Sequence, residues 1–212
     1  NGANELLDSA SLPASYIEEA EVFIYGSVTL ATRSRDAALK AAQLARSANH
    51  HVMFDCNLRP ALWHNLEEAR TQIEAALATA TIVKVNEIEL EFLTGTRDVE
   101  KGSQNLLTRG AELCCVSLGK DGAFFSNGKV TGHVPAFYVR VKSTVGSGDA
   151  FVAGLAFQVC ELEQPIASLK HDELFNIVRF ANACGAIVAT QEGAMSAKLN
   201  QGLVERLVQT RL

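Results

Sequence analysis

Short runs of β-branched and aromatic residues alternate with longer segments rich in Ala, Leu, Glu and Arg along the first half of this chain. Turn residues bound the short runs, which predicts strands, and the longer segments have a helix-favouring composition. Strands that alternate with helices form βα units, whose right-handed crossovers build a parallel sheet. The strands are predicted at 22–25, 52–55, 82–85 and 113–118, and the helices between them at 35–48, 66–80 and 99–110.

The pattern changes after the fourth predicted strand. Asn127-Gly128 lies between two strand-like runs, which is a strong signal for a β-hairpin, so an antiparallel edge is expected there. A further strand-like run, Tyr138 to Val141, precedes the segment GSGD, and three apolar-faced helices are predicted at 150–160, 172–190 and 201–209. The sequence therefore predicts a doubly wound, mostly parallel α/β sheet flanked by helices, with an antiparallel edge hairpin, in one domain spanning residues 1–212.

The composition restricts the possible partners. The chain has 212 residues, 48% of them hydrophobic, and a net charge of −5, which disfavours nucleic acid and anionic membrane surfaces. No apolar run approaches the roughly 20 residues of a membrane-spanning helix, and the first ten residues lack a signal-peptide pattern. Five cysteines without regular spacing favour reduced thiols. We expect a cytoplasmic protein with small-molecule partners, no nucleic acid and no membrane, and the oligomeric state is left open.

Polar residues follow several of the predicted strands. Asp55 to Arg59 come after the second strand, Asn86 and Glu89 after the third, and Gly119 after the fourth. In an open α/β sheet, ligands bind beyond the carboxyl ends of the strands. Each cluster alone is more often a turn or a helix cap, but their recurrence in successive units favours a binding site at this edge.

The segment Gly146-Ser147-Gly148-Asp149 opens an apolar helix. In one interpretation the glycines make a tight turn and Asp149 caps the helix. In the other, backbone amides at the helix N-terminus bind an anion, and the Asp149 carboxylate accepts a proton from a hydroxyl that attacks phosphorus. The chain contains no G-x-x-x-x-G-K-[ST] pattern, so a P-loop nucleotide site is not indicated.

Five segments carry a family resemblance. STVGSGDAFVAG resembles the D-T-x-G-A-G-D-x-F-x-x-G signature of the ribokinase-like (PfkB) sugar kinases, and FDCNLRPALW resembles their D-x-N-x-R-x-x-x-W segment. VNEIELEFLTG, SLGKDGAFF and FANACGAIVATQEGA resemble their N-x-x-E segment, their T-L-G-x-x-G segment and their C-terminal nucleotide-side helix. The likeness is closest to bacterial fructokinases and aminoimidazole riboside kinase. It implies a ribokinase-like fold and ATP-dependent phosphorylation of a primary hydroxyl on a small sugar, with fructose as the first candidate.

The resemblance also assigns roles to individual residues. It implies Asp149 as the general base, the amides of Gly146, Ser147 and Gly148 as the anion hole, and Arg59 as a contact to the substrate or the transferring phosphate. A salt bridge from Arg59 to Asp55 is the alternative. For ATP and Mg²⁺ the implied residues are Asn86 and Glu89 (Mg²⁺, through water), Ser117 and Gly119 (nucleotide channel), and Asn182 and Gly185 (beside the adenine).

The chain departs from the family pattern at two places. Ser143 stands where the signature often begins with Asp, which leaves potassium (K⁺) activation open. Nothing matches the N-terminal sugar contacts and β-lid of the family, so the likeness is expected to begin near Val22 and the chain to be part of something longer. The alternative functions are therefore a truncated nucleotide-binding remnant without turnover, and a regulatory or scaffold protein that binds no nucleotide.

Other residues carry weaker signals. His50, His51, His64 and Cys56 lack the spacing of a zinc site. Trp63 either stacks on a ligand or anchors the loop that contains Arg59. Cys114 and Cys115 are assigned to packing within a strand.

Overall fold

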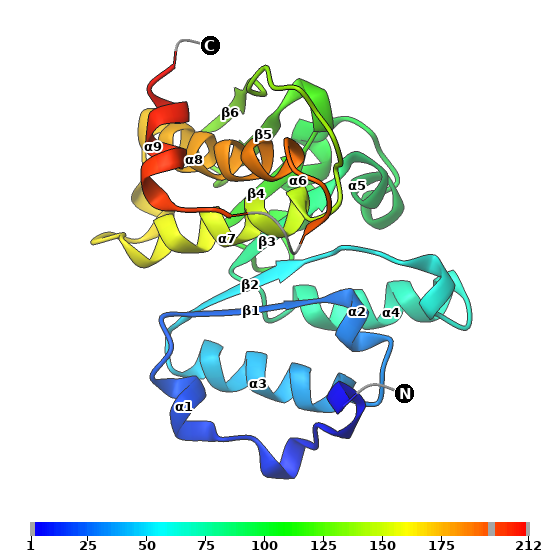
Figure 1. Cartoon of the computed structure of the whole chain (residues 1–212). Helices are drawn as coiled ribbons and strands as arrows, with labels where there is room; N and C mark the ends of the chain where they lie inside the picture. The colour runs from blue at the N-terminus through cyan, green and yellow to red at the C-terminus, as the bar shows by residue number, and fades with distance from the viewer. Residues whose placement is uncertain (1–2, 195–197, 211–212) are drawn as a thin grey trace. The chain divides into compact units, whose positions relative to one another are not determined.

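The structure is a computed structural model that describes residues 3–194 and 198–210. Six strands form a sheet in the order β1-β2-β3-β4-β5-β6, which is also their order along the chain (Figure 1). β1 to β3 pair in parallel, whereas β5 and β6 pair antiparallel. The predicted mostly parallel sheet with an antiparallel edge hairpin is confirmed. The strands are β1 (Val22–Gly26), β2 (His51–Asp55), β3 (Ile82–Asn86), β4 (Leu113–Ser117), β5 (Ala123–Ser126) and β6 (Thr131–Val134).

The chain divides into two compact units, Asn1–Cys114 and Cys115–Leu212. The first contains α1 (Ala14–Glu18), α2 (Ser27–Leu30), α3 (Arg35–Ser47), α4 (Leu66–Leu77), α5 (Glu87–Thr94) and α6 (Val99–Leu107). The second contains α7 (Ser147–Cys160), α8 (His171–Ala189) and α9 (Gln201–Val208). Short 3-10 turns lie at Ala3–Leu6, Ser9–Ser11, Pro60–Leu62, Gly119–Asp121 and Ile166–Ser168. The assignment of residues 1–212 to one domain stays a prediction.

In the first unit, α3 packs against β1 and β2 (Figure 1). The helix buries only alanines on this face, so its backbone can approach the sheet closely: Ala37, Ala38, Ala41, Ala42 and Ala45. α4 and α6 are preceded by the N-cap residues Asn65 and Asp98, whose side chains accept hydrogen bonds from first-turn amides. All three helices predicted in this part of the chain are confirmed, and each ends one to three residues earlier than expected.

In the second unit, the β5–β6 hairpin is fixed by the side chain of Asn127. Its Oδ1 accepts hydrogen bonds from the amides of Lys129 and Val130, and its Nδ2 donates to the carbonyls of Ile166 and Leu169. The four bonds satisfy a side chain that is 7% exposed. Asn127 therefore closes the predicted hairpin and ties it to the segment after α7.

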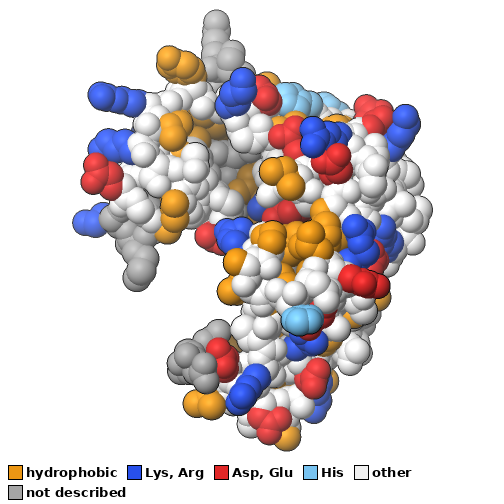
Figure 2. Space-filling model, turned by 90° about the vertical axis from the view of Figure 1, so that its right-hand side faces the viewer, with side chains coloured by type: hydrophobic (Ala, Val, Ile, Leu, Met, Phe, Trp, Pro, Cys, Tyr) orange, Lys and Arg blue, Asp and Glu red, His pale blue; other side chains and the backbone are white. Residues whose placement is uncertain are grey.

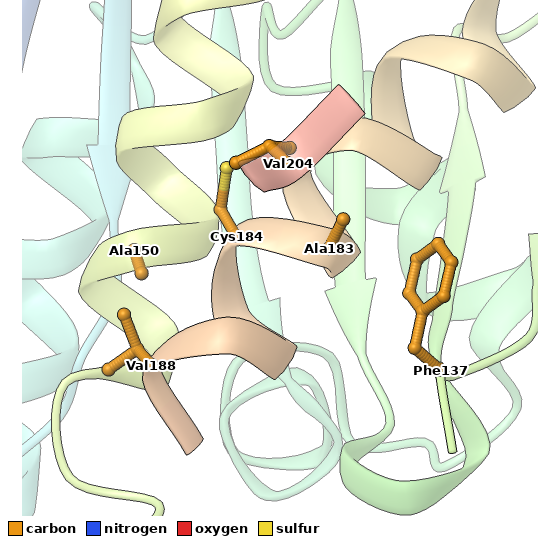
Figure 3. Close-up of a cluster of buried hydrophobic side chains, with 6 residues drawn as sticks. All are labelled: Phe137, Ala150, Ala183, Cys184, Val188 and Val204. Atoms are coloured by element: carbon orange, nitrogen blue, oxygen red, sulfur yellow. The ribbon is translucent and has the colours of Figure 1, made fainter. Parts of the chain in front are cut away.

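The three helices of the second unit share a small apolar cluster. α7 and α8 pack along each other, and α9 packs on α8 (Figure 1). An added Cβ at Gly154 would lie 2.7 Å from Cys184 Sγ, so glycine permits the close approach of α7 to α8. Burial raises the pKa of the Cys184 thiol to about 11. Figure 3 shows the members of the cluster: Phe137, Ala150, Ala183, Cys184, Val188 and Val204.

One prediction of secondary structure is wrong, and one helix was missed. The run Tyr138 to Val141 is irregular chain rather than a strand, and Pro135, which has no amide hydrogen for a strand ladder, precedes it. Just beyond it, the amides of Lys142 and Ser143 donate to the carbonyl of Ala189, so this segment is held by the end of α8. A separate helix, α5, was not expected because its residues resemble a binding motif. The burial of Cys114 and Cys115 within β4 is confirmed.

The surface carries both signs of charge. In Figure 2 acidic and basic side chains are interspersed on the face in view, without a continuous block of either sign. Within the described part of the chain, no helix combines the length and the apolar character needed to span a membrane.

Candidate active site

A pocket of about 540 Å³ lies in the second unit. Apolar side chains form much of its wall, among them Phe137, Tyr138, Val139 and Phe151. Pockets that combine apolar walls with a few polar groups are typical ligand sites. Six residues that the sequence assigned to anion or nucleotide binding also line it: Ser117, Gly119, Ser147, Gly148, Asn182 and Gly185.

The turn before α7 brings backbone amides to the pocket wall. Gly146 is the N-cap residue with a φ of 84°, in the left-handed region, and α7 begins at Ser147. The Ser147 amide donates to the carbonyl of Thr144 at 3.2 Å, so one of the three amides predicted for the anion hole is already engaged. Among the described residues, the amides of Gly148 and Asp149 have no acceptor, as expected in the first turn of a helix. The Gly146 amide likewise has no acceptor among the described residues, so two of the three predicted amides, those of Gly146 and Gly148, remain open together with that of Asp149.

Asp149 lies in the first turn of α7, and the residue is exposed. The interpretation of Asp149 as the helix cap is wrong, because Gly146 occupies the N-cap position and Asp149 is the third residue of the helix. The carboxylate is thus not used to start the helix and faces away from the core. It follows directly after Gly148, which lines the pocket. This arrangement places an exposed carboxylate on a residue whose own amide is open.

Gly146 is required at its position both by its backbone angle and by its surroundings. An added Cβ would lie 2.5 Å from the Cβ of Ala194, and any other residue would also be strained at this φ. We expect Gly146→Ala to lower the free energy of unfolding by about 1–3 kcal/mol, measured by urea denaturation. Gly95→Ala is the matched control, because Gly95 has a φ of 75° but no atom within 4 Å of an added Cβ. Equal losses in the two variants would show that the contact with Ala194 has no effect.

Ser143 contributes to the same turn. Its Oγ accepts a hydrogen bond from the amide of Val145 at 3.2 Å. The hydroxyl therefore organises the turn where many family members carry a carboxylate.

Asn182 and Gly185 lie on the α8 side of the pocket. Asn182 Nδ2 donates to the carbonyl of Val134 at 3.2 Å and so links α8 to β6. An added Cβ at Gly185 would lie 3.0 Å from the carbonyl oxygen of Ser147, so glycine lets α8 approach the start of α7. Both residues therefore have a packing role as well as a place on the pocket wall.

Asn86 and Glu89 belong to the first unit and form a capping box at the start of α5. Asn86 Oδ1 accepts from the amide of Glu89 at 2.9 Å, and Glu89 Oε2 accepts from the amide of Asn86 at 2.8 Å. Glu89 Oε1 accepts from the amide of Leu58 at 2.9 Å. Glu89 is 3% exposed, and both of its oxygens are bound to backbone amides. Because a carboxylate oxygen has a second lone pair, these groups still fit a contact to a metal through water.

Arg59 and Asp55 have separate partners in the structure. Asp55 forms a buried ion pair with Lys84, with 3.1 Å between Lys84 Nζ and Asp55 Oδ1. Arg59 is exposed, and its Nη1 donates to the carbonyl of Leu58 at 3.3 Å. The sequence interpretation missed Lys84, because an apolar strand run gives no signal for a buried cation.

Trp63 anchors the loop that follows Arg59. Its side chain is buried, and the Arg35 guanidinium lies 5.9 Å from the centre of its ring. Arg35 also donates to Glu68 and to the carbonyl of Leu30, which fixes it over the ring. Of the two interpretations of Trp63, the structure supports anchoring rather than stacking on a ligand. Among residues 3–194 and 198–210, no three His, Cys, Asp or Glu side chains are grouped as metal ligands.

The sequence interpretation also missed part of the pocket. Tyr138, Val139 and Val141 line it, although they were expected to form a strand. Tyr138 is fully exposed, and Pro135 just before this segment was the available signal against a strand. Gly122 also lines the pocket, with a φ of 97° and with the backbone of Val134 so close that no side chain fits.

The fold is that of an α/β protein with a pocket in its second unit. The family model described as "pfkB family carbohydrate kinase" matches residues 1–201. The chain belongs to this family. The match begins at residue 1, so the expectation that the likeness starts near Val22 is wrong. The opening segment has packing residues such as Ile17 but no catalytic motif that would reveal it.

Individual relatives agree with the family. Fructokinase-1 of Oryza sativa subsp. japonica is 40% identical over 210 residues, covering 98% of this chain and 64% of the relative. Aminoimidazole riboside kinase from Salmonella enterica, crystallised with aminoimidazole riboside and an ATP analogue, has 33% identity and a TM-score of 0.86 over 99% of this chain and 69% of its own. A fructokinase double mutant from Vibrio cholerae O395, with fructose, ADP and potassium bound, has 31% identity and a TM-score of 0.85 over 96% and 64%. The chain thus spans less than two thirds of the rice relative's length.

Proposed function

We propose that the protein is an ATP-dependent sugar kinase that transfers the γ-phosphate to a primary hydroxyl of a small sugar, with fructose as the first candidate. The observation that carries this proposal is the pocket wall at Gly148, where open amides stand beside an exposed carboxylate that neither caps the helix nor packs in the core. Family membership and 40% identity to a fructokinase support the same reaction class.

Asp149 is the proposed general base. The sugar hydroxyl attacks the γ-phosphorus in line, its proton passes to the Asp149 carboxylate, and the bond from the γ-phosphorus to the bridging oxygen breaks to release ADP. The amides of Gly148 and Asp149 and the N-terminal end of the 14-residue helix α7 stabilise the negative charge on the phosphoryl oxygens.

The remaining pocket residues suit the nucleotide. Apolar walls at Phe137, Val139 and Ala186 can pack against a planar base, while Ser117 and Gly119 border the path towards the GSGD turn. Asn182 and Gly185 line the α8 side, which is the side that the family resemblance implies for the adenine.

Mg²⁺ is the proposed metal, and Asn86 and Glu89 are the residues that would hold it through water. When bound with ATP, it would supply neutralisation of charge on the phosphate oxygens. Oxygen donors suit this hard cation, and the buried, amide-bound state of Glu89 favours an indirect contact. Arg59 is proposed to contact the sugar or the transferring phosphate, a role that suits its exposed, planar guanidinium.

The test is to incubate the chain with ATP, Mg²⁺ and fructose, to follow ADP release by a coupled assay, and to measure ATP binding by calorimetry. We expect saturable ADP release that depends on the sugar. Nucleotide binding without turnover would overturn the kinase proposal in favour of a nucleotide-binding remnant, and neither signal would favour a regulatory or scaffold role. Ribose and aminoimidazole riboside, assayed in parallel, test the choice of sugar.

A further inference from the structure

The loop between β2 and the 3-10 turn at Pro60–Leu62 is held from three different elements. The Cys56 amide donates to the carbonyl of Lys84 at 3.0 Å, and Ser27 Oγ donates to the carbonyl of Asn57 at 3.3 Å. The amide of Leu58 donates to Glu89 Oε1 at 2.9 Å. Each residue that leads to Arg59 is therefore fixed by its own hydrogen bond.

This loop needs external support because its backbone is strained. Asn57 has a φ of 36°, in the left-handed region that non-glycine residues rarely adopt. Such a conformation persists only where surrounding contacts impose it, and strained loops of this kind are often found at functional sites. The residue that leaves the loop is Arg59, whose guanidinium is exposed.

Glu89 does more than a helix cap requires. A capping box uses one carboxylate oxygen on the N-cap amide, and Oε2 makes that bond with Asn86. The other oxygen, Oε1, reaches across to Leu58, 31 residues earlier in the chain. A single buried carboxylate thus joins the start of α5 to the residue immediately before Arg59.

We propose that Glu89 is a positioning residue for Arg59. Its carboxylate holds the Leu58 amide, and this fixes the backbone position from which the Arg59 guanidinium reaches the sugar or the transferring phosphate. The inference rests on the proposed kinase function and deepens it. The positioning role of Glu89 can be separated from its proposed role in holding Mg²⁺, because the effect of positioning on the rate does not depend on the metal concentration.

The first measurement is the steady-state kinetics of Glu89→Gln. Glutamine keeps the shape of the side chain but has one acceptor oxygen for two amides, so one of the two bonds is lost. We expect kcat/KM for the sugar, measured at saturating Mg²⁺, to fall about 100-fold, because small displacements of a positioning group have large effects, with metal-free ATP binding unchanged by calorimetry. Saturating Mg²⁺ compensates for a weakened metal contact, so the loss that remains reports on the position of Arg59. Recovery of activity at high Mg²⁺ would overturn the proposal.

The second measurement is a double-mutant cycle with Arg59→Ala. If Glu89 acts through Arg59, the double variant Glu89→Gln/Arg59→Ala is no slower than Arg59→Ala within about twofold, since the two changes remove one function. Losses that multiply would show independent roles and would overturn the inference. A wild-type kcat/KM in Arg59→Ala would overturn it as well, while leaving the kinase function intact.

Ser27→Ala provides a separate test if Glu89→Gln fails to fold. It removes the hydrogen bond to Asn57 from a side chain that has no part in the capping box. We expect a smaller loss in kcat/KM for the sugar, about threefold to tenfold, again independent of Mg²⁺ and absent in the Arg59→Ala background. Wild-type kinetics in Ser27→Ala would contradict the need to hold this loop. Absence of turnover in the wild type would overturn the kinase function and this inference together.

Discussion

Asp149→Asn is expected to lower kcat by several orders of magnitude while the Kd for ATP stays within about threefold of the wild type. General base catalysis contributes roughly 10²–10⁴-fold, and asparagine keeps the shape of the side chain but cannot accept the proton. The open amides of the α7 turn remain in the variant, so the binding site for the phosphates is preserved. The measurement is kcat from the coupled assay together with calorimetric ATP binding.

Glu161→Gln is the matched control for this prediction. Glu161 is the C-cap residue of α7, at the opposite end of the helix from the open amides and Asp149. We expect its kcat to equal that of the wild type. Near-normal turnover in Asp149→Asn would remove Asp149 from the role of base, whatever the control shows.

Lys84→Met is expected to lower the free energy of unfolding by about 3–5 kcal/mol, the usual effect of removing one partner from a buried ion pair. Lys84 and Asp55 are 5% and 7% exposed, so methionine would leave the Asp55 carboxylate buried opposite an apolar side chain. Urea denaturation followed by tryptophan fluorescence measures this effect in the first unit, because Trp63 is the only tryptophan in the chain.

An exposed Lys–Asp ion pair serves as the control for the loss of stability expected in Lys84→Met. Lys101 and Asp98 are 3.2 Å apart with side chains 79% and 41% exposed, and such pairs contribute at most about 1 kcal/mol. Lys101→Met should therefore have a small effect. The double variant Lys84→Met/Asp55→Asn should recover part of the lost stability, since the buried side chain at position 55 is then neutral. Equal effects of Lys84→Met and Lys101→Met would contradict the importance of the buried pair.

The sheet could be predicted from the sequence because its central strands are continuous apolar runs bounded by turns. β2, β3 and β4 bury nearly every residue, which is the pattern of strands covered on both faces. The same criterion misled at Tyr138 to Val141, where apolar residues line a pocket instead of entering the sheet. Apolar character alone does not distinguish a core strand from a ligand wall.

The candidate site was predictable where motif and geometry coincide. The residues at or beside the pocket include the GSGD turn, Ser117, Gly119, Asn182 and Gly185. They could be predicted because glycines and short polar residues at fixed spacing form a recognisable sequence motif. Asn86 and Glu89 show the limit of this approach. A spacing of three residues suits a metal site and a capping box equally well, so only the structure reveals the hydrogen bond from the Leu58 amide to Glu89. The functional roles of these residues stay predictions.

The hairpin loop at Asn127 has a consequence for the chemical durability of the protein. Asn-Gly sequences in flexible chains deamidate when the following backbone nitrogen attacks the side-chain amide. Here the Gly128 amide donates to Ser126 Oγ, and both polar atoms of the Asn127 side chain are bound, so the folded loop resists ring closure. An aspartate formed at this position would turn a carboxylate towards the carbonyls of Ile166 and Leu169 and could not donate the two hydrogen bonds that Asn127 Nδ2 makes to them. Deamidation would therefore weaken the attachment of the β5–β6 hairpin at the edge of the sheet.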